Sequence, residues 1–307
     1  MDVGVIGVGS MGRNHARIYS ELKMVDSLLV YDTDRRAAGE MERLHGATAC
    51  GSVGDLLSRA DAVSLCLPTE HHFQVAMQAI GAGVHALIEK PVCSTSAQGR
   101  ALLSAIPDGL VVGVGHIERF NPVVTEIGRI IRKPLYLEMK RHNPTSSRVK
   151  GASVVEDLMI HDIDIALHAF FHKKPTSLVS AGNDDIASVL LEWDGTPVYL
   201  STSRKASKKI RMCYIEEEEF TVEGDFMAQE VYVHRKPDRY AQEGDRYVQE
   251  NIIEKVMVNK LEPLKVELST FLACAAKGEP FPVTPAEAVE NLEICEEIRR
   301  KLSGFPG

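Results

Sequence analysis

The chain opens with Asp2-Val3-Gly4-Val5-Ile6-Gly7-Val8-Gly9-Ser10-Met11-Gly12, and this stretch decides the expected fold. Residues 2–6 form an apolar run that predicts a short buried strand, and residues 12–23 have the pattern of a helix. The glycines between them follow the Gly-x-Gly-x-x-Gly spacing, which permits a tight turn and a close approach of the backbone to a pyrophosphate. The amides at the start of the helix can bind that anion, so a dinucleotide site is expected here.

An acidic residue stands where a dinucleotide site requires one. Asp32 follows a predicted strand at 27–31, about twenty residues after Gly12. Its carboxylate can accept hydrogen bonds from the adenosine ribose and would repel a 2′-phosphate, so NAD is expected in preference to NADP. Arg35 and Arg36 leave NADP open, because a guanidinium nearby could neutralise that phosphate. The residues expected to bind the cofactor are Gly7, Gly9, Ser10, Met11, Gly12, Asp32, Pro68, Thr69, His72, Glu89 and Lys90.

Strands and helices alternate through the first part of the chain. Further strands are predicted near 47–49 and at 62–67, 84–88 and 110–114, with helices at about 34–44 and 70–82. Such alternation predicts a mainly parallel sheet with helices on both faces. Residues 1–119 are therefore expected to form an NAD-binding domain with a doubly wound Rossmann sheet.

The pattern changes after about residue 134. A strand at 135–140 and a helix near 156–171 precede a run of predicted strands at 177–182, 186–193, 197–203, 209–215 and 218–223. Helices are predicted at 264–276 and 285–302, while 234–262 is polar and is not assigned. This indicates a second, α+β domain over 120–307, built on a large mixed or antiparallel sheet that binds the substrate. One open face of that sheet favours a homodimer or homotetramer.

Composition narrows the class of protein. The 307 residues carry a formal net charge of -8, so nucleic acid is not an expected partner. The six cysteines are widely spaced, without a zinc-binding pattern, which fits a reducing compartment. The start of the chain lacks a basic leader, and no apolar run approaches the length of about 18 residues that spans a bilayer. A cytoplasmic protein that does not contact membranes is expected.

A lysine follows directly on an apolar run in Ala86-Leu87-Ile88-Glu89-Lys90-Pro91. In a doubly wound sheet, ligands bind at the carboxyl ends of the strands, so this amine is expected to face the cofactor that the glycines bind. The juxtaposition indicates nicotinamide redox chemistry.

A second polar group lies on the helix near 156–171. Asp157, His161, Asp164 and His168 share one side of a helix with 3.6 residues per turn, while the intervening residues are largely apolar. Such a polar stripe is expected to face either solvent or a functional site. His161, Asp164 and His168 are residue types that could bind a metal. Hydride transfer to NAD needs none, so no metal is expected.

The chain resembles the Gfo/Idh/MocA family of oxidoreductases over nearly its whole length. The resemblance lies in the order and spacing of three motifs: the glycine turn, Glu89-Lys90-Pro91 and the later Asp157-x-x-x-His161. The resemblance implies that Lys90 is catalytic, that the Lys90–Pro91 peptide is cis and that no metal takes part. Oxidation of a secondary alcohol requires removal of the hydroxyl proton as hydride leaves carbon. His161, which titrates near neutrality when unperturbed, is the expected general base.

The other roles follow from the same chemistry. Lys90 would stabilise the charge that develops on the alcohol oxygen, although Lys90 and His161 could exchange roles. Asp157 could orient the His161 ring and relay the proton. Glu89 is expected to hold Lys90 or the nicotinamide ribose.

The substrate is expected to be a sugar or a nucleotide sugar. The segment from Val114 to Pro122, with its Gly-His-x-Glu-Arg-Phe-Asn-Pro sequence, is similar to the family branch that acts on the 3-hydroxyl of UDP-N-acetylglucosamine. Arginines beyond it could meet a diphosphate, and Arg204, Lys205, Lys208 and Lys209 add cations or form only an exposed hairpin. The residues expected to contact substrate are Lys90, His116, Glu118, Arg119, Asn121, Arg141, Asn143, Arg148, Asp157 and His161.

Two alternatives stay open. Residues 157–162 are also similar to the inositol-acting branch, which favours an inositol or free-sugar dehydrogenase. Some relatives of this fold have lost turnover and act as NAD-responsive regulators or binding proteins. Retention of Lys90, Asp157 and His161 argues against that class.

Overall fold

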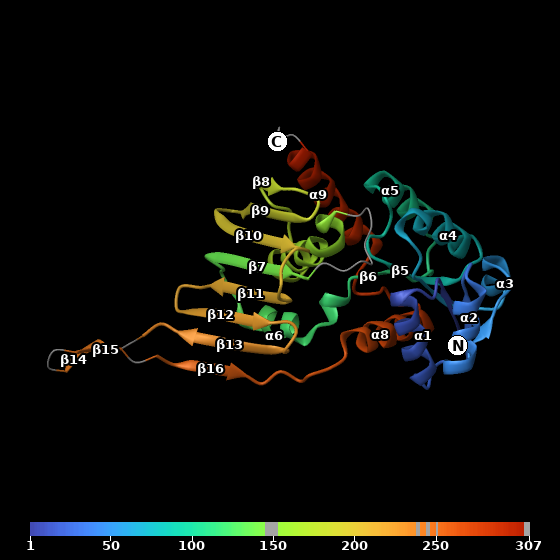
Figure 1. The fold of residues 1–307 in the computed structure, drawn as a ribbon, viewed down its shortest axis with the longest axis horizontal. Helices are drawn as coiled ribbons and strands as arrows, with labels where there is room; N and C mark the ends of the chain where they lie inside the picture. The colour runs from blue at the N-terminus through green and yellow to red at the C-terminus, as the bar shows by residue number, and fades with distance from the viewer. Residues whose placement is uncertain (145–152, 238–239, 244–245, 250, 304–307) are drawn as a thin grey trace. The chain divides into compact units, whose positions relative to one another are not determined.

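The computed structural model describes residues 1–144, 153–237, 240–243, 246–249 and 251–303, and Figure 1 traces the chain. Two compact units are present. The first comprises Met1–Phe120 and Glu262–Glu293, and the second comprises Asn121–Leu261 and Ile294–Gly307. The sequence predicted one continuous second domain over 120–307. The difference arises because 262–293 supplies apolar side chains, among them Phe271 and Phe281, to the core of the first unit.

The first unit contains a six-stranded sheet, and each neighbouring pair of its strands is parallel. The order is β3-β2-β1-β4-β5-β6, in which the chain moves outward from β1 in one direction and then in the other. This is the strand order of dinucleotide-binding doubly wound sheets, and it confirms the predicted fold. The strands are β1 (Asp2–Ile6), β2 (Ser27–Tyr31), β3 (Thr48–Ala49), β4 (Ala62–Leu65), β5 (His85–Glu89) and β6 (Val112–Gly115).

Helices connect these strands in two groups. Helix α1 contacts α2 and α8, whereas α4 contacts α3 and α5, as expected when right-handed crossovers place helices on both faces of a sheet. Helices α3 and α5 were not predicted, although Ser52 and Thr95 cap their first turns with side-chain hydrogen bonds. The helices are α1 (Ser10–Glu21), α2 (Arg35–His45), α3 (Val53–Leu57), α4 (Thr69–Gly81), α5 (Ser96–Ala105), the 3₁₀ turn η1 (Ile117–Phe120), α8 (Pro263–Lys277) and α9 (Pro285–Ser303), of which the residues from Ile294 onward belong to the second unit.

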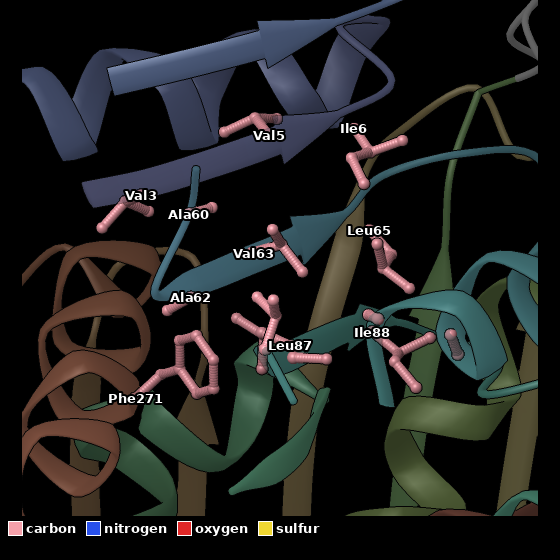
Figure 2. Packing of buried hydrophobic residues seen from close by; sticks show 14 of the residues in the cluster. Val3, Val5, Ile6, Ala60, Ala62, Val63, Leu65, Leu87, Ile88 and Phe271 are labelled. Carbon is pink, nitrogen blue, oxygen red and sulfur yellow. The ribbon is translucent and has the colours of Figure 1, made fainter. Parts of the chain in front are cut away.

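The core of the first unit lies along the central strands (Figure 2). Parallel strands covered on both faces have nearly continuous apolar sequences, and Val63 and Leu65 of β4 and Leu87 and Ile88 of β5 are fully or almost fully buried. Phe271 from α8 packs into the same cluster. Burial of both sheet faces fixes these strands, and thereby the positions of the loops at their ends.

The second unit contains an eight-stranded mixed sheet of order β16-β13-β12-β11-β7-β10-β9-β8. Only the β7–β10 pair is parallel among the ladders described. The predicted mixed sheet is confirmed, and it extends into the polar region that the sequence left unassigned. The strands are β7 (Tyr136–His142), β8 (Ser177–Gly182), β9 (Ile186–Trp193), β10 (Thr196–Ser203), β11 (Ile210–Glu216), β12 (Phe220–Asp225), β13 (Glu230–Arg235) and β16 (Ile253–Val256); β14 (Tyr240–Glu243) and β15 (Arg246–Gln249) pair separately.

The two faces of this sheet differ. Along β9, Val189, Leu191 and Trp193 are buried, while the alternate Leu190 and its register partner Val179 on β8 are exposed. Helix α6 (Pro122–Ile130) packs on the buried face, where Gly224 of β12 leaves room for Ile127. The same core cluster includes the helical segment made of η2 (Val155–Met159), α7 (Ile160–Asp164) and η3 (Ile165–Phe171).

Candidate functional site

A pocket of about 570 Å³ opens at the carboxyl ends of the central strands of the first unit. Parallel strands end at the same edge of a sheet, so loops distant in sequence meet there. The pocket is lined by Gly7, Gly9, Met11, Tyr31, Asp32, Thr33, Cys66, Leu67, Pro68, His71, Glu89 and Lys90. It therefore brings together the glycine loop, the acid after β2 and the lysine after β5, as the sequence analysis expected.

The three glycines are needed for different reasons. Gly7 has a φ of +89°, and a Cβ there would also lie 2.8 Å from the carbonyl oxygen of Cys66. A Cβ on Gly12 would lie 1.8 Å from the carbonyl oxygen of Gly7, so the helix can approach the loop only with glycine at this position. A Cβ on Gly9 would meet nothing within 4 Å, and Gly9 lines the pocket. The loop thus leaves open the space that the phosphates of a dinucleotide would fill, and the site fits such a cofactor.

Asp32 is bound on both carboxylate oxygens. Its Oδ2 accepts the backbone N–H of Val8 at 2.7 Å, and its Oδ1 accepts the N–H of Asp34 at 2.8 Å. Asp34 in turn caps α2 by accepting the N–H of Arg36. These bonds fix the Asp32 carboxylate beside the glycine loop. They also place negative charge at the edge of the pocket.

Glu89 and Lys90 end β5. The Lys90–Pro91 peptide is cis, as the family resemblance implied. Glu89 is buried, with Oε1 3.1 Å from Nε2 of His15, and its Oε2 accepts the backbone N–H of Lys90 at 3.2 Å. Burial alone would raise the pKa of the Glu89 carboxyl. The hydrogen bond and attraction of His15, with Lys90 and His72, outweigh burial and hold this pKa below its usual value.

The adjacent histidines at the start of α4 have different surroundings. His71 lines the pocket, whereas the ring of His72 is fully buried and lies 2.9 Å from the carbonyl oxygen of Leu67 and 2.8 Å from that of Pro91. His72 was predicted to bind the cofactor, whereas His71 was not. Helix periodicity could have separated them, because His72 continues the buried row of Val75, Ala76 and Ala79. His72 thus links the loop after β4 to the Lys90–Pro91 segment.

Ser10, Gly12 and Thr69, which were also expected at the cofactor, do not line this pocket. Ser10 and Thr69 begin α1 and α4, and Gly12 packs behind the loop against Gly7. The pocket contains several residues that the sequence analysis did not select: Tyr31, Thr33, Cys66, Leu67 and His71.

The residues after β6 were expected at the substrate. His116 and Glu118 are buried, and the Arg119 guanidinium lies 3.5 Å from a Glu287 carboxylate oxygen. Asn121 is buried in the second unit, where its side chain caps α6 through the N–H of Val123 and donates to the Phe226 carbonyl oxygen. These two hydrogen bonds of Asn121 stabilise the second unit.

In the second unit, Asp157 and His161 occupy a helix that is otherwise almost entirely buried. From Ser153 to Leu167, every residue is buried except Glu156, Asp157 and His161. The two side chains expected to act on substrate are thus among the few on this segment that reach its surface. A carboxylate and an imidazole one turn apart can hold and move a proton.

The predicted polar stripe is only partly correct. Asp164 is buried, unlike Asp157, His161 and His168. The prediction assumed 3.6 residues per turn, but η2 and η3 are π-helical, with wider turns that change which side chains share a side.

Arg141 has a different place from the one expected. Its side chain is 1% exposed, and its Nε and Nη2 donate to Oδ1 of Asp162 at 2.9 and 2.7 Å. The guanidinium also lies over the Phe226 ring, and the Arg141 carbonyl accepts the Thr202 hydroxyl. A buried arginine engaged in this way ties β7 to the helix that carries His161, so a role as a phosphate ligand is not supported.

Two of the remaining expected cations, Arg204 and Lys205, lie beside the same carboxylate. Nε of Arg204 lies 3.7 Å from Oδ1 of Asp185, and Nζ of Lys205 lies 3.0 Å from its Oδ2. Asn143 is half-buried after β7, and its backbone N–H donates to the Ser203 carbonyl oxygen. Arg148 lies outside the described residues.

Two properties of the described residues bear on other functions. They contain no group of three or more His, Cys, Asp or Glu side chains arranged to hold a metal ion. Across the same residues, every helix is too short or too polar to cross a membrane.

Comparison with known proteins shows similarity along the whole chain. The family model described as the oxidoreductase family with an NAD-binding Rossmann fold matches residues 1–117. UDP-N-acetylglucosamine 3-dehydrogenase from Acidithiobacillus ferrooxidans is 32% identical, over 99% of this chain and 98% of its own length. Its solved structure superimposes with a TM-score of 0.89 over 99% of this chain and 98% of that one, at 29% identity.

More distant relatives have other substrates in their names. Inositol 2-dehydrogenase from Rhizobium meliloti is 24% identical over 98% of this chain and 96% of its own length. A levoglucosan dehydrogenase in complex with NADH and levoglucosan shares the fold, with a TM-score of 0.81 at 17% identity, over 99% of this chain and 97% of that one.

Proposed function

The chain belongs to the Gfo/Idh/MocA family of oxidoreductases, enzymes that act on CH–OH groups, and we propose that it oxidises the 3-hydroxyl of UDP-N-acetylglucosamine to the 3-keto nucleotide sugar with NAD. The observation that carries the proposal is the similarity to the Acidithiobacillus enzyme over almost the full length of both chains, including both units. The pocket beside Asp32, Glu89 and Lys90 supports it from the chain's own geometry.

A nicotinamide cofactor bound in this pocket supplies the hydride acceptor. We assign the other steps to side chains of this protein. The Lys90 ammonium hydrogen-bonds the alcohol oxygen and stabilises its developing charge, His161 accepts the hydroxyl proton, and Asp157 orients the imidazole. Glu89 holds the backbone of Lys90 through Oε2.

The choice of NAD rests on Asp32. Its carboxylate lines the pocket and is held there by two backbone N–H groups. A fixed negative charge at this position disfavours a 2′-phosphate and accepts hydrogen bonds from the free ribose hydroxyls.

Inositol is the second candidate substrate. It is supported by the Rhizobium inositol 2-dehydrogenase, which aligns with nearly all of this chain, although at lower identity than the nucleotide-sugar enzyme. Inositol lacks a diphosphate, so the two candidates differ in the charge that the substrate-binding residues must meet.

A substrate panel separates the candidates. The protein is mixed with NAD and, separately, with UDP-N-acetylglucosamine, myo-inositol and glucose, and the near-ultraviolet absorbance of reduced cofactor is followed. The proposal predicts reduction with the nucleotide sugar. Reduction with inositol alone would contradict it, and tight NAD binding without turnover on a broad panel would indicate a regulator.

We also propose a homodimer or homotetramer. The support is the exposed face of the second unit's sheet, which carries Val179 and Leu190. Light scattering in solution tests this, and a monomeric mass at micromolar concentration would contradict it.

A further inference from the structure

A histidine inside the first unit has no role in the chemistry assigned so far. His15 lies on α1, three residues after Gly12, and its side chain is buried. It continues the buried row formed by Gly12, Ala16 and Tyr19, where the helix would otherwise carry apolar residues. A polar ring in such a row requires a hydrogen-bonding partner, because burial without one is costly.

That partner is Glu89, the residue directly before Lys90. His15 Nε2 lies 3.1 Å from Glu89 Oε1, and since a carboxylate only accepts hydrogen bonds, Nε2 carries the proton in this contact. The other ring nitrogen, Nδ1, is buried without a hydrogen-bond partner among the described residues. The bond to Glu89 is thus the one that orients the ring, which also packs edge-on against Tyr19.

The structure also makes room for the carboxylate. A Cβ on Gly115, at the end of β6, would lie only 3.1 Å from Glu89 Oε1. The other oxygen, Oε2, accepts the N–H of Lys90. Glu89 therefore connects α1 on one side to the backbone of the proposed catalytic lysine on the other.

We propose that His15 is a positioning residue for Lys90: it holds the Glu89 carboxylate, which in turn fixes the backbone from which the lysine side chain extends. The proposal deepens the proposed function and rests on it for the consequence in turnover. The predicted change in the titration of Glu89 is independent of the proposed function, because it can be measured without substrate.

Charge around Glu89 gives the proposal a measurable signature. The groups that act on this carboxylate are His15 from α1, His72 from α4 and Lys90. Tyr19 and Cys66 are also close enough to interact electrostatically with Glu89, and Glu267 of α8 acts on both of them. Because burial opposes ionisation of Glu89 and His15 is the main group that favours it, loss of His15 should raise the pKa of Glu89.

The test compares His15→Leu, which removes the hydrogen bond, with His15→Gln, whose amide can still donate one. ¹³C NMR of labelled glutamate carboxyls follows the titration, and the resonance missing from Glu89→Gln identifies Glu89. We expect Glu89 to titrate about one pH unit or more higher in His15→Leu than in the wild type, and His15→Gln to restore part of the shift. His85→Gln, on the opposite end of β5, is the matched control and should leave the titration unchanged.

Turnover provides the second readout. His15→Leu should lower kcat by up to about 10²-fold with little change in the KM for NAD, and the acid limb of its pH profile should move upward with the Glu89 titration. His15→Leu combined with Glu89→Gln should be no slower than Glu89→Gln alone, because both act through one carboxylate.

The outcomes separate the two proposals. An unchanged Glu89 titration in both His15 variants, or fully multiplicative effects in the double variant, overturns the positioning role. If Glu89 shifts as expected while the wild type oxidises no sugar of the panel, the positioning pair stands and the proposed function fails. If NMR shows that His15→Leu is unfolded, the test relies on His15→Gln. The proposal would then be contradicted if Glu89 titrates in His15→Gln as it does in the wild type while kcat falls tenfold or more.

Discussion

Oδ2 of Asp32 accepts a hydrogen bond from the backbone N–H of Val8 at 2.7 Å, so the acid at the end of β2 supports the glycine loop as well as lining the pocket. The same carboxylate binds the N–H of Asp34 through Oδ1. Asp32 therefore has two separable effects. Its charge acts on the ligand in the pocket, and its hydrogen bonds hold the loop that faces the same ligand.

Asp32→Asn should separate charge from hydrogen bonding. The amide oxygen can still accept one backbone N–H, but the repulsion of a 2′-phosphate is lost, so the ratio of kcat/KM for NAD to that for NADP should fall. Asp32→Ala loses both hydrogen bonds and should weaken NAD binding about 10- to 100-fold, equivalent to about 1.5–3 kcal/mol. Calorimetric binding of both cofactors measures this. Asp34→Asn, which keeps a cap for α2, is the control, and an equal loss in that variant would contradict the role of Asp32.

Alanine at two glycines should have opposite consequences. Gly9→Ala should fold normally, because its Cβ meets nothing within 4 Å, yet it should weaken dinucleotide binding because the methyl enters the pocket. Gly12→Ala should destabilise the protein, because its Cβ would overlap the Gly7 carbonyl oxygen. Thermal unfolding with and without NAD distinguishes these effects. A Gly9→Ala protein with wild-type NAD affinity would show that the phosphates bind elsewhere.

Lys90→Ala should leave NAD affinity nearly intact and lower turnover by about 10²–10⁴-fold, the range for a lost acid–base or electrostatic group. His161→Ala should behave similarly. Their combination should be less severe than the product of the single effects, because both groups are assigned to one oxygen. Steady-state rates together with calorimetric NAD binding measure this, and wild-type turnover in Lys90→Ala would remove the lysine from the mechanism.

Arg141→Met should destabilise the second unit. It leaves the buried Asp162 carboxylate without the two hydrogen bonds at 2.9 and 2.7 Å, and breaking one partner of a buried ion pair costs about 3–5 kcal/mol. Replacing both residues, in Arg141→Met with Asp162→Leu, should recover part of that loss. Urea unfolding followed by circular dichroism measures both. A loss of substrate affinity without loss of stability would return Arg141 to the substrate-binding set.

Glu89 should contribute to stability in a pH-dependent way. Its pKa in the folded protein lies below the ordinary value of 4.5. The stabilisation is therefore fully present above pH 4.5, and it is lost as the pH falls through the pKa of the folded protein. Glu89→Gln should thus show a smaller decline in unfolding free energy on acidification than the wild type. Urea titrations between about pH 3 and 7 measure the difference. Parallel declines in the two proteins would mean that this carboxylate is not held in its charged form.

Sequence patterns predicted the parts of the fold that depend on local periodicity. The buried run at 62–67 and the glycine turn before 12–23 specify a strand, a turn and a helix almost without tertiary information. The short helices at Val53–Leu57 and Ser96–Ala105 were missed because their sequences have weak apolar periodicity. Only their N-cap residues indicate where these helices begin. The strand β16 was missed because polar residues dominate its region, and pairing within the sheet stabilises it. The strand β13 was also missed, although the alternation that buries Val231 and Val233 is the pattern of a strand.

The candidate site was less predictable than the fold, because residue type does not reveal a partner. Arg141 has the chemistry of a phosphate ligand, and only the structure shows Asp162 beside it. His15 was not predicted as a functional residue, because it lies in a buried row of a helix and its hydrogen-bond partner, Glu89, is distant in sequence. Lys90 was identified because it directly follows a strand whose end must lie at the ligand-binding edge of a parallel sheet.

The most direct test of the proposed reaction follows a single atom. UDP-N-acetylglucosamine carrying deuterium on carbon 3 of the sugar is incubated with the protein and NAD, and the reduced cofactor is analysed by mass spectrometry. Hydride transfer from that carbon predicts deuterium in the reduced cofactor and a slower rate than with unlabelled substrate. Reduced cofactor without deuterium would contradict oxidation at the 3-hydroxyl.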